Sequence, residues 1–181
     1  MQKMNKTKYL TTMALLSTIS LVLTRFLSFY IPFMGAQSMR VGFGAVPVIL
    51  AGLLLGPSAG GFVGLAADLV GATLFPSGPF FPGFTLSAFL VGFMPAFFVK
   101  LFNKKEQGLK KTILFLFILC TQVITSALLN TLWIIFLYMS PFSIDKFWAL
   151  FSIRAPFSFL MSIVYTTIIY PLFIRISKET I

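Results

Sequence analysis

The sequence has no histidine, a single cysteine and few charged residues. Histidine is the commonest metal ligand and the usual proton shuttle, so its absence argues against a metal site or proton relay built on imidazole. The single cysteine, Cys120, excludes an internal disulfide framework, and its place in an apolar run predicts a small side chain that fills the core. Only 10% of the 181 residues are charged, whereas a soluble domain carries about 25%. The composition therefore argues against an ordinary soluble domain.

Apolar residues fill most of the chain instead. Hydrophobic side chains make up 58% of the residues, and the mean hydropathy is +0.97. About 20 apolar residues cross the hydrocarbon core as a helix, which satisfies its own backbone hydrogen bonds in lipid. We therefore predict an all-α integral membrane protein with a single domain over residues 1–181. Residues 9–24, 41–67, 69–99, 112–144 and 155–174 contain no charged side chain.

Six membrane helices account for these stretches, and the basic residues orient them. The helices are predicted over residues 9–30, 41–55, 59–74, 84–101, 112–139 and 148–176. The positive-inside rule then places both termini in the cytoplasm, and the external loops are residues 31–40, 75–83 and 140–147. The net charge of +10 follows from this topology, so no nucleic-acid partner is expected. Ten of the 14 basic residues fall on the cytoplasmic side: Lys3, Lys6, Lys8, Lys100, Lys104, Lys105, Lys110, Lys111, Arg175 and Lys178.

Four polar side chains lie inside the predicted helices at similar depth in the outer half of the membrane. A charge at membrane depth costs ~2.5–3.5 kcal/mol on insertion scales, so such residues face a cavity or a partner. Their convergence predicts one site that opens outward. The alternative is structural: the first arginine reaches the interface, and the aspartate neutralises one arginine across helices. The four residues are Arg25, Asp68, Asn130 and Arg154.

The charges of this outer half are unbalanced. Arg25, Arg40 and Arg154 bring three positive charges against one negative charge on Asp68, an excess of two. A ligand carboxylate would pair with a buried guanidinium through two parallel hydrogen bonds. The site is therefore expected to bind an anion.

An aromatic loop lies next to the predicted site. Residues 75–84 read FPSGPFFPGF, and their rings offer a stacking surface for a flat ligand. An interfacial aromatic belt is the alternative, although a belt favours tryptophan and tyrosine, which this loop lacks. Trp133 follows Asn130 by three residues on the same helix face, so it is expected to line the same cavity.

The first helix carries small residues at a spacing that permits close helix packing. Ala14 and Thr18 are four residues apart, and small residues at this spacing let membrane helices approach each other. The face either packs within the bundle or docks another membrane subunit.

Several segments resemble a known family. Residues 40–85 read RVGFGAVPVILAGLLLGPSAGGFVGLAADLVGATLFPSGPFFPGFT, which is similar to the signature of the folate-type S-component of energy-coupling factor (ECF) transporters. LVLTRFLSFY at residues 21–30 and LLNTLW at residues 128–133 are similar to that family as well. The matching pieces cover roughly residues 10–135, and Arg154 is a further match. RVGFG, GPSAGG, AADLVGA and FPGFT occur in the expected order and spacing, which makes the resemblance specific.

The resemblance implies a six-transmembrane-helix S-component bundle that captures a vitamin outside the cell. Its partners would be the transmembrane coupling subunit EcfT and two ABC ATPase subunits that use ATP, and Ala14 and Thr18 would dock EcfT. This chain would bind no cofactor and no metal and would not be an enzyme. It would be a multi-pass protein surrounded by the lipid of a bacterial plasma membrane.

Folate is the substrate that the resemblance implies, and it agrees with the charges. Its pterin ring offers an amino group and a ring N–H to Asp68, and its glutamate tail offers two carboxylates to Arg40 and Arg154. Arg25 is then a third carboxylate partner or holds Asp68. The full set of expected substrate-binding residues is Arg25, Phe26, Arg40, Asp68, Phe80, Phe84, Thr85, Asn130, Trp133 and Arg154.

Three other functions remain open from the sequence. One is an S-component for another vitamin such as riboflavin or thiamine, although cationic thiamine fits poorly with excess arginine. Another is a membrane enzyme, which would need clustered carboxylates or histidines that the chain lacks. The last is a non-transporting membrane assembly subunit without a small-molecule ligand.

Overall fold

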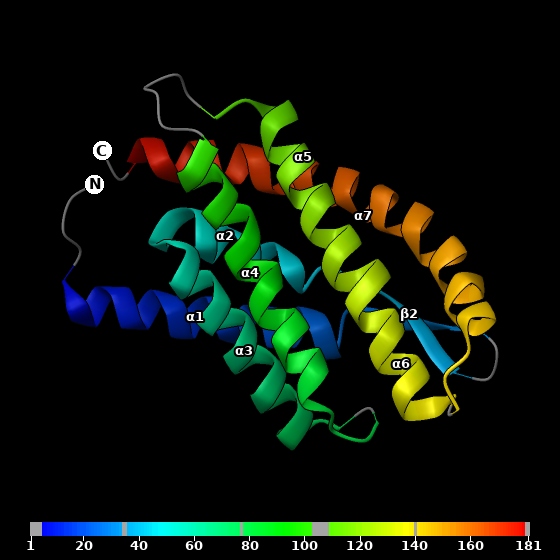
Figure 1. The fold of residues 1–181 in the computed structure, drawn as a ribbon. Coiled ribbons are helices and arrows are strands. Elements are labelled where there is room, and N and C mark those ends of the chain that lie inside the picture. Colours follow the sequence, from blue (N-terminus) through cyan, green and yellow to red (C-terminus); the bar gives the residue numbers. More distant parts are fainter. Residues whose placement is uncertain (1–4, 34–35, 77, 103–108, 140, 180–181) are drawn as a thin grey trace.

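The computed structural model describes residues 5–33, 36–76, 78–102, 109–139 and 141–179 and shows a helical bundle with one small hairpin (Figure 1). Four helical stretches of the described residues are long and apolar enough to cross a membrane, and a shorter apolar helix, Ala45–Leu55, lies among them. These four stretches are Pro57–Leu74, Pro82–Phe102, Lys111–Tyr138 and Ile144–Ser177. In chain order the elements are α1 (Lys6–Arg25), β1 (Ser28–Phe33), β2 (Ala36–Gly42), α2 (Ala45–Leu55), α3 (Pro57–Leu74), α4 (Pro82–Phe102), α5 (Lys111–Gln122), the π-helical segment η1 (Val123–Leu129), α6 (Asn130–Tyr138) and α7 (Ile144–Glu179).

The helix termini gather at two opposite ends of the bundle. The start of α1, the end of α4, the start of α5 and the end of α7 lie together at one end (Figure 1). The hairpin, the α3–α4 connection and the α6–α7 connection lie at the other end (Figure 1). Successive helical stretches therefore run back and forth between the two ends.

The hairpin was not predicted, and it corrects the N-terminal part of the sequence reading. The first helix was expected over residues 9–30 and a loop over 31–40, whereas α1 ends at Arg25 and two antiparallel strands follow. The segment SFYIPF is rich in aromatic and β-branched residues, which favour extended backbone. Pro32 has no backbone N–H to donate to the β1–β2 hydrogen bonds, and it disfavours helical backbone at Ile31. The pairing register of the two strands shifts between Ile31 and Pro32.

The other predicted helices are present with shifted ends. Prolines set two of the starts: Pro57 is the first residue of α3, and α4 begins at Pro82. Proline suits the first turn of a helix because its missing N–H has no helical partner there. The last helix begins at Ile144 rather than at residue 148, with Asp145 in its first turn, where a negative charge is favoured. The predicted helix over 112–139 is continuous but contains the π-helical segment η1.

Glycines bring α2, α3 and α4 into backbone contact. A Cβ atom on Gly92 would overlap the carbonyl oxygen of Gly60, and a Cβ on Gly60 would lie 2.5 Å from the Cα of Gly52. Small residues drive close helix packing in lipid, where there is no hydrophobic force between helices. Each of these glycines therefore sits where the backbone of a neighbouring helix fills the space of a side chain.

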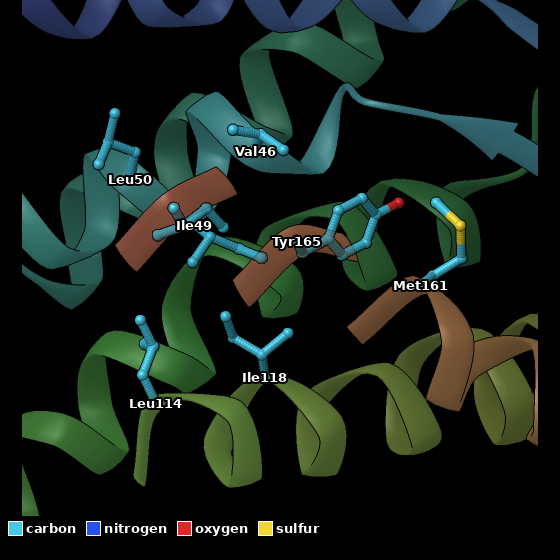
Figure 2. Packing of buried hydrophobic residues seen from close by; sticks show 8 residues of the cluster. Val46, Ile49, Leu50, Leu114, Ile118, Met161 and Tyr165 are labelled. Atoms are coloured by element: carbon cyan, nitrogen blue, oxygen red, sulfur yellow. The ribbon is translucent and has the colours of Figure 1, made fainter. Parts of the chain in front are cut away.

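A hydrophobic core joins α2 to the second half of the chain. Figure 2 shows side chains of α2, α5 and α7 gathered in the space between these helices. Ile49, Leu114 and Ile118 are completely buried there. Cys120, expected in the core, is instead exposed on α5. In a helix of 3.6 residues per turn, Leu114 and Ile118 share one face and Cys120 faces away from it.

The glycine contact predicts a large effect of a single substitution. We expect Gly60→Val to lower the thermal stability of the purified protein, because overpacking a tight interface costs about 1–3 kcal/mol or more. Thr73→Val, an exposed change on the same helix, is the control and should leave the melting temperature within a degree or two of the unaltered protein. Equal melting temperatures for both variants would show that α3 and α4 are not in close contact.

Candidate functional site

A cavity of about 330 Å³ lies in the half of the bundle toward the hairpin. Its wall comes from the end of α1, the junction of β2 with α2, and residues of α3, α4, η1, α6 and α7. The walls are mostly apolar and include a few charged and amide groups. Those groups belong to Arg25, Asp68, Gln122, Asn130 and Arg154.

Asp68 is held by a threonine of the neighbouring helix. Its Oδ2 accepts a hydrogen bond of 2.8 Å from Oγ1 of Thr85, which is 8% exposed. One turn before Asp68, Gly64 lets α3 approach α4 so closely that a Cβ would overlap the carbonyl oxygen of Ala88. Among the described residues, the hydrogen-bond donor to the carboxylate is Thr85 and not an arginine. Thr85 does not line the cavity itself, and its hydrogen bond fixes the orientation of the carboxylate.

Arg25 is the last residue of α1 and reaches across to α3. A Cβ on Gly71 would lie 2.7 Å from Nε of Arg25, so the missing side chain of Gly71 makes room for the guanidinium. Gly71 follows Asp68 by three residues and shares its helix face. Arg25 was expected about five residues before the helix end; the hairpin ends the helix earlier, and Arg25 stands at the rim of the bundle.

Arg154 is deeply buried in α7 and is tied to η1. Its side chain is 6% exposed, and its Nε donates a hydrogen bond of 3.0 Å to the carbonyl oxygen of Ser126. Because α7 begins four residues earlier than predicted, Arg154 lies ten residues into the helix rather than about six. Both Arg154 and Ser126 line the cavity.

Asn130 and Trp133 lie one turn apart on α6, but only Asn130 lines the cavity. Asn130 lines the cavity, and its Oδ1 is buried without a hydrogen-bond partner among the described residues. Trp133 was expected to line the cavity but stands behind it. Its Nε1 donates to Oγ of Ser87 at 3.2 Å, and its ring lies 5.6 Å from that of Phe81. Ser87 and Phe81 line the cavity, so Trp133 supports the wall from outside.

The aromatic residues divide in the same way. Phe80 and Phe84 line the cavity, and their contact with a ligand stays a prediction. Phe26 does not line the cavity: its side chain is 65% exposed and packs edge to face against Phe75 at 5.5 Å. Phe26 directly follows the end of α1, and the earlier end of that helix turns it away from the cavity. Arg40 lies on β2, but its side chain is outside the described part, so its carboxylate contact stays a prediction.

Polar residues that were not predicted from the sequence line the inner end of the cavity. Gln122 on α5 is 6% exposed. Tyr165 on α7 donates a hydrogen bond of 3.0 Å from its hydroxyl to the carbonyl oxygen of Gly42. Ser20 and Ser158 also line this part. Polar residues in an otherwise apolar helix are a signal for a site, and Gln122 carries that signal eight residues before Asn130.

The small-residue face of α1 is not covered by the described chain. Ala14 and Thr18 are both exposed, and Thr18 Oγ1 donates to the carbonyl oxygen of Ala14 at 3.0 Å. This intrahelical bond satisfies the hydroxyl without a neighbouring helix. The face therefore does not pack within the described bundle, which leaves the docking interpretation as a proposal.

A helical membrane bundle with a partly polar cavity is typical of a membrane protein that binds a small ligand. Comparison with known protein families identifies the family. The family described as "ECF transporter, substrate-specific component" matches residues 8–173, so the chain belongs to this family. It is a family of transporter components and not of enzymes.

Known relatives agree with this assignment. Over 131 residues, 72% of this chain and 70% of the relative, the sequence is 37% identical to the folate transporter FolT of Clostridium novyi (strain NT). The crystal structure of FolT bound with folic acid matches with a TM-score of 0.71 at 26% identity, covering 90% of this chain and 91% of that one. The S component of a bacterial ECF transporter matches with a TM-score of 0.70 at 25% identity, covering 97% and 99%.

The placement of the two tryptophans predicts which of them reports on the cavity. Trp133 contacts its wall, whereas Trp148 is 59% exposed on α7. We expect ligand binding to change the fluorescence of the Trp148→Phe variant as it does that of the unaltered protein. The Trp133→Phe variant should lose most of this signal, with binding checked by calorimetry. A signal that survives in Trp133→Phe and vanishes in Trp148→Phe would place the ligand elsewhere.

Proposed function

We propose that this chain captures folate from outside the cell as the substrate-specific subunit of an ECF importer. The observation that carries the proposal is the Asp68 carboxylate, oriented by Thr85 in the wall of a cavity inside an apolar bundle. Membership of the ECF family and the identity of 37% with a folate transporter support it.

The aromatic half of folate suits the Asp68 side of the cavity. A pterin ring is flat and presents an amino group beside a ring N–H, which together match the two oxygens of one carboxylate. Hydrogen bonds to charged groups are stronger than neutral ones, and they gain strength where water is excluded. Phe80 and Phe84, which also line the cavity, supply aromatic rings for a flat ligand.

The acidic half of folate suits the arginines. Among the described residues the cavity is lined by two guanidinium groups, Arg25 and Arg154, against the one carboxylate of Asp68. The excess positive charge favours a ligand whose tail carries carboxylates. We propose Arg40 as a further partner of that tail. The cavity volume of about 330 Å³ falls within the usual range for small-molecule sites, about 300–1,000 Å³.

Six membrane crossings with both termini in the cytoplasm are part of the proposal. The start of α1 and the end of α7 lie at one end of the bundle in Figure 1, together with the end of α4 and the start of α5. The helix ends gathered there carry Lys6, Lys8, Lys100, Lys110, Lys111 and Arg175. Basic residues of this kind stay on the cytoplasmic side, so the cavity at the opposite end opens outward.

Uptake then requires partner subunits. We propose that EcfT and two ABC ATPase subunits complete the importer, that the ATPases use the ATP, and that the complex lies in a bacterial plasma membrane. The exposed Ala14 and Thr18 of α1 would contact EcfT, because small side chains permit close approach of a second helix.

The first experiment measures binding of folate, riboflavin and thiamine to the purified protein, with Asp68→Asn as the test variant. We expect folate to bind and Asp68→Asn to weaken its binding roughly 10-fold to 150-fold, the loss of charge-assisted hydrogen bonds worth about 1.5–3 kcal/mol. Asp145→Asn, which removes an exposed carboxylate, is the matched control and should bind folate normally. Binding of another vitamin alone would change the substrate and keep the importer. Binding of none would favour an assembly subunit.

The proposed topology predicts which positions are reachable from outside intact cells. In a Cys120→Ala background, a membrane-impermeant maleimide should label Phe142→Cys in intact cells. Lys110→Cys, at the start of α5, should react only after the cells are opened. Labelling of Lys110→Cys in intact cells would reverse the proposed orientation.

A further inference from the structure

The π-helical segment η1 interrupts a membrane helix beside the cavity. The backbone N–H of Asn130, directly after η1, donates to the carbonyl oxygen of Thr125, five residues back. In an α-helix the same N–H would donate to the carbonyl of Ser126, four residues back. Single π-turns inside α-helices occur frequently at functional sites. Here the changed pairing shifts the register of the helix immediately before Asn130.

The carbonyl that α-helical pairing would give to Asn130 is bound by an arginine of another helix. Nε of Arg154 donates to the carbonyl oxygen of Ser126 at 3.0 Å, and the arginine is 6% exposed. Inside a membrane protein every backbone carbonyl needs a donor, and the protein must provide it. The planar guanidinium offers its N–H groups at fixed angles, which the ammonium group of a lysine does not reproduce.

A second trace of the register shift appears at Thr131. This side chain is completely buried, and its Oγ1 has no hydrogen-bond partner among the described residues. Other buried hydroxyls of α5, η1 and α7 donate to the carbonyl four residues back; these are Thr121, Thr125, Ser158, Ser162 and Thr166. The missing bond at Thr131 lies directly after the π-turn, next to the changed backbone pairing of Asn130.

Asn130, directly after the π-turn, is one of the residues of this segment that line the cavity. Its Oδ1 is a buried acceptor without a partner among the described residues. A buried acceptor without a donor destabilises the ligand-free protein. An N–H group of a bound ligand would supply the missing donor, which would make ligands without such a group bind more weakly.

We infer that Arg154 is a positioning residue: through the Ser126 carbonyl it stabilises the π-turn, and the π-turn directs Oδ1 of Asn130 toward an N–H donor of the ligand. The inference rests on the proposed function because the N–H donor for Asn130 is assigned to the aromatic half of folate. The role of Arg154 in supporting the π-turn depends on its guanidinium group and not on its charge alone. Replacing it with lysine keeps the charge and removes the guanidinium.

The binding test compares folate with pteroate, which lacks the glutamate tail. Arg154→Lys and Asn130→Leu should each weaken the binding of both ligands by about tenfold. The double variant should bind no more weakly than the worse single variant, because the two residues act through one contact. Arg175→Lys, at the other end of α7, is the control and should bind like the unaltered protein. A loss confined to folate, or losses that multiply in the double variant, would overturn the inference.

A measurement without ligand tests separately whether Arg154 stabilises the π-turn. Amide hydrogen exchange over residues 123–131 should be faster in Arg154→Lys than in the unaltered protein and in Arg175→Lys. Unchanged exchange there would show that Arg154 does not support the π-turn. If neither folate nor pteroate binds the unaltered protein, the proposed substrate fails, and the exchange rates still show whether Arg154 stabilises η1.

Discussion

The carboxylate of Asp68 inside an apolar bundle is the constraint on which the rest of the site depends. A charge at membrane depth is unfavourable unless partners and a polar cavity surround it. Close packing of α3 on α4 at Gly64 brings Thr85 to the carboxylate, and the missing side chain of Gly71 admits Arg25 to the same helix face. The small residues of α3 therefore shape the membrane bundle and its binding site at once.

The charges of the site could be predicted from the sequence because lipid makes them conspicuous. Arg25, Asp68, Asn130 and Arg154 stand out against long apolar runs, and the structure places all four around one cavity. The helices were predictable for the same reason. The hairpin was not, because strand pairing joins segments that the local pattern does not relate, and apolar residues near a membrane suggest a helix first. Cys120 shows a similar limit, since residues facing lipid and residues facing the core are equally apolar.

The finer parts of the site depend on register, which an apolar sequence specifies weakly. Phe26 lies outside the cavity because α1 ends one residue before it. Trp133 stands behind Phe81 and Ser87 rather than at the surface of the cavity. The π-turn of η1 changes the helix register by one residue, and VITSALL gives no sign of it. Thr85 was suggested by family resemblance and not by spacing, and the structure gives it a defined partner, Asp68.

The most direct test of the central claim is an experimental structure of the protein with folate bound. The carboxylate of Asp68 should then lie within hydrogen-bond distance of the amino group and ring N–H of the pterin, with Thr85 still donating to it. The glutamate tail should lie on the side of the arginines. Folate bound with its glutamate tail at Asp68, or bound outside this cavity, would contradict the role assigned to this carboxylate.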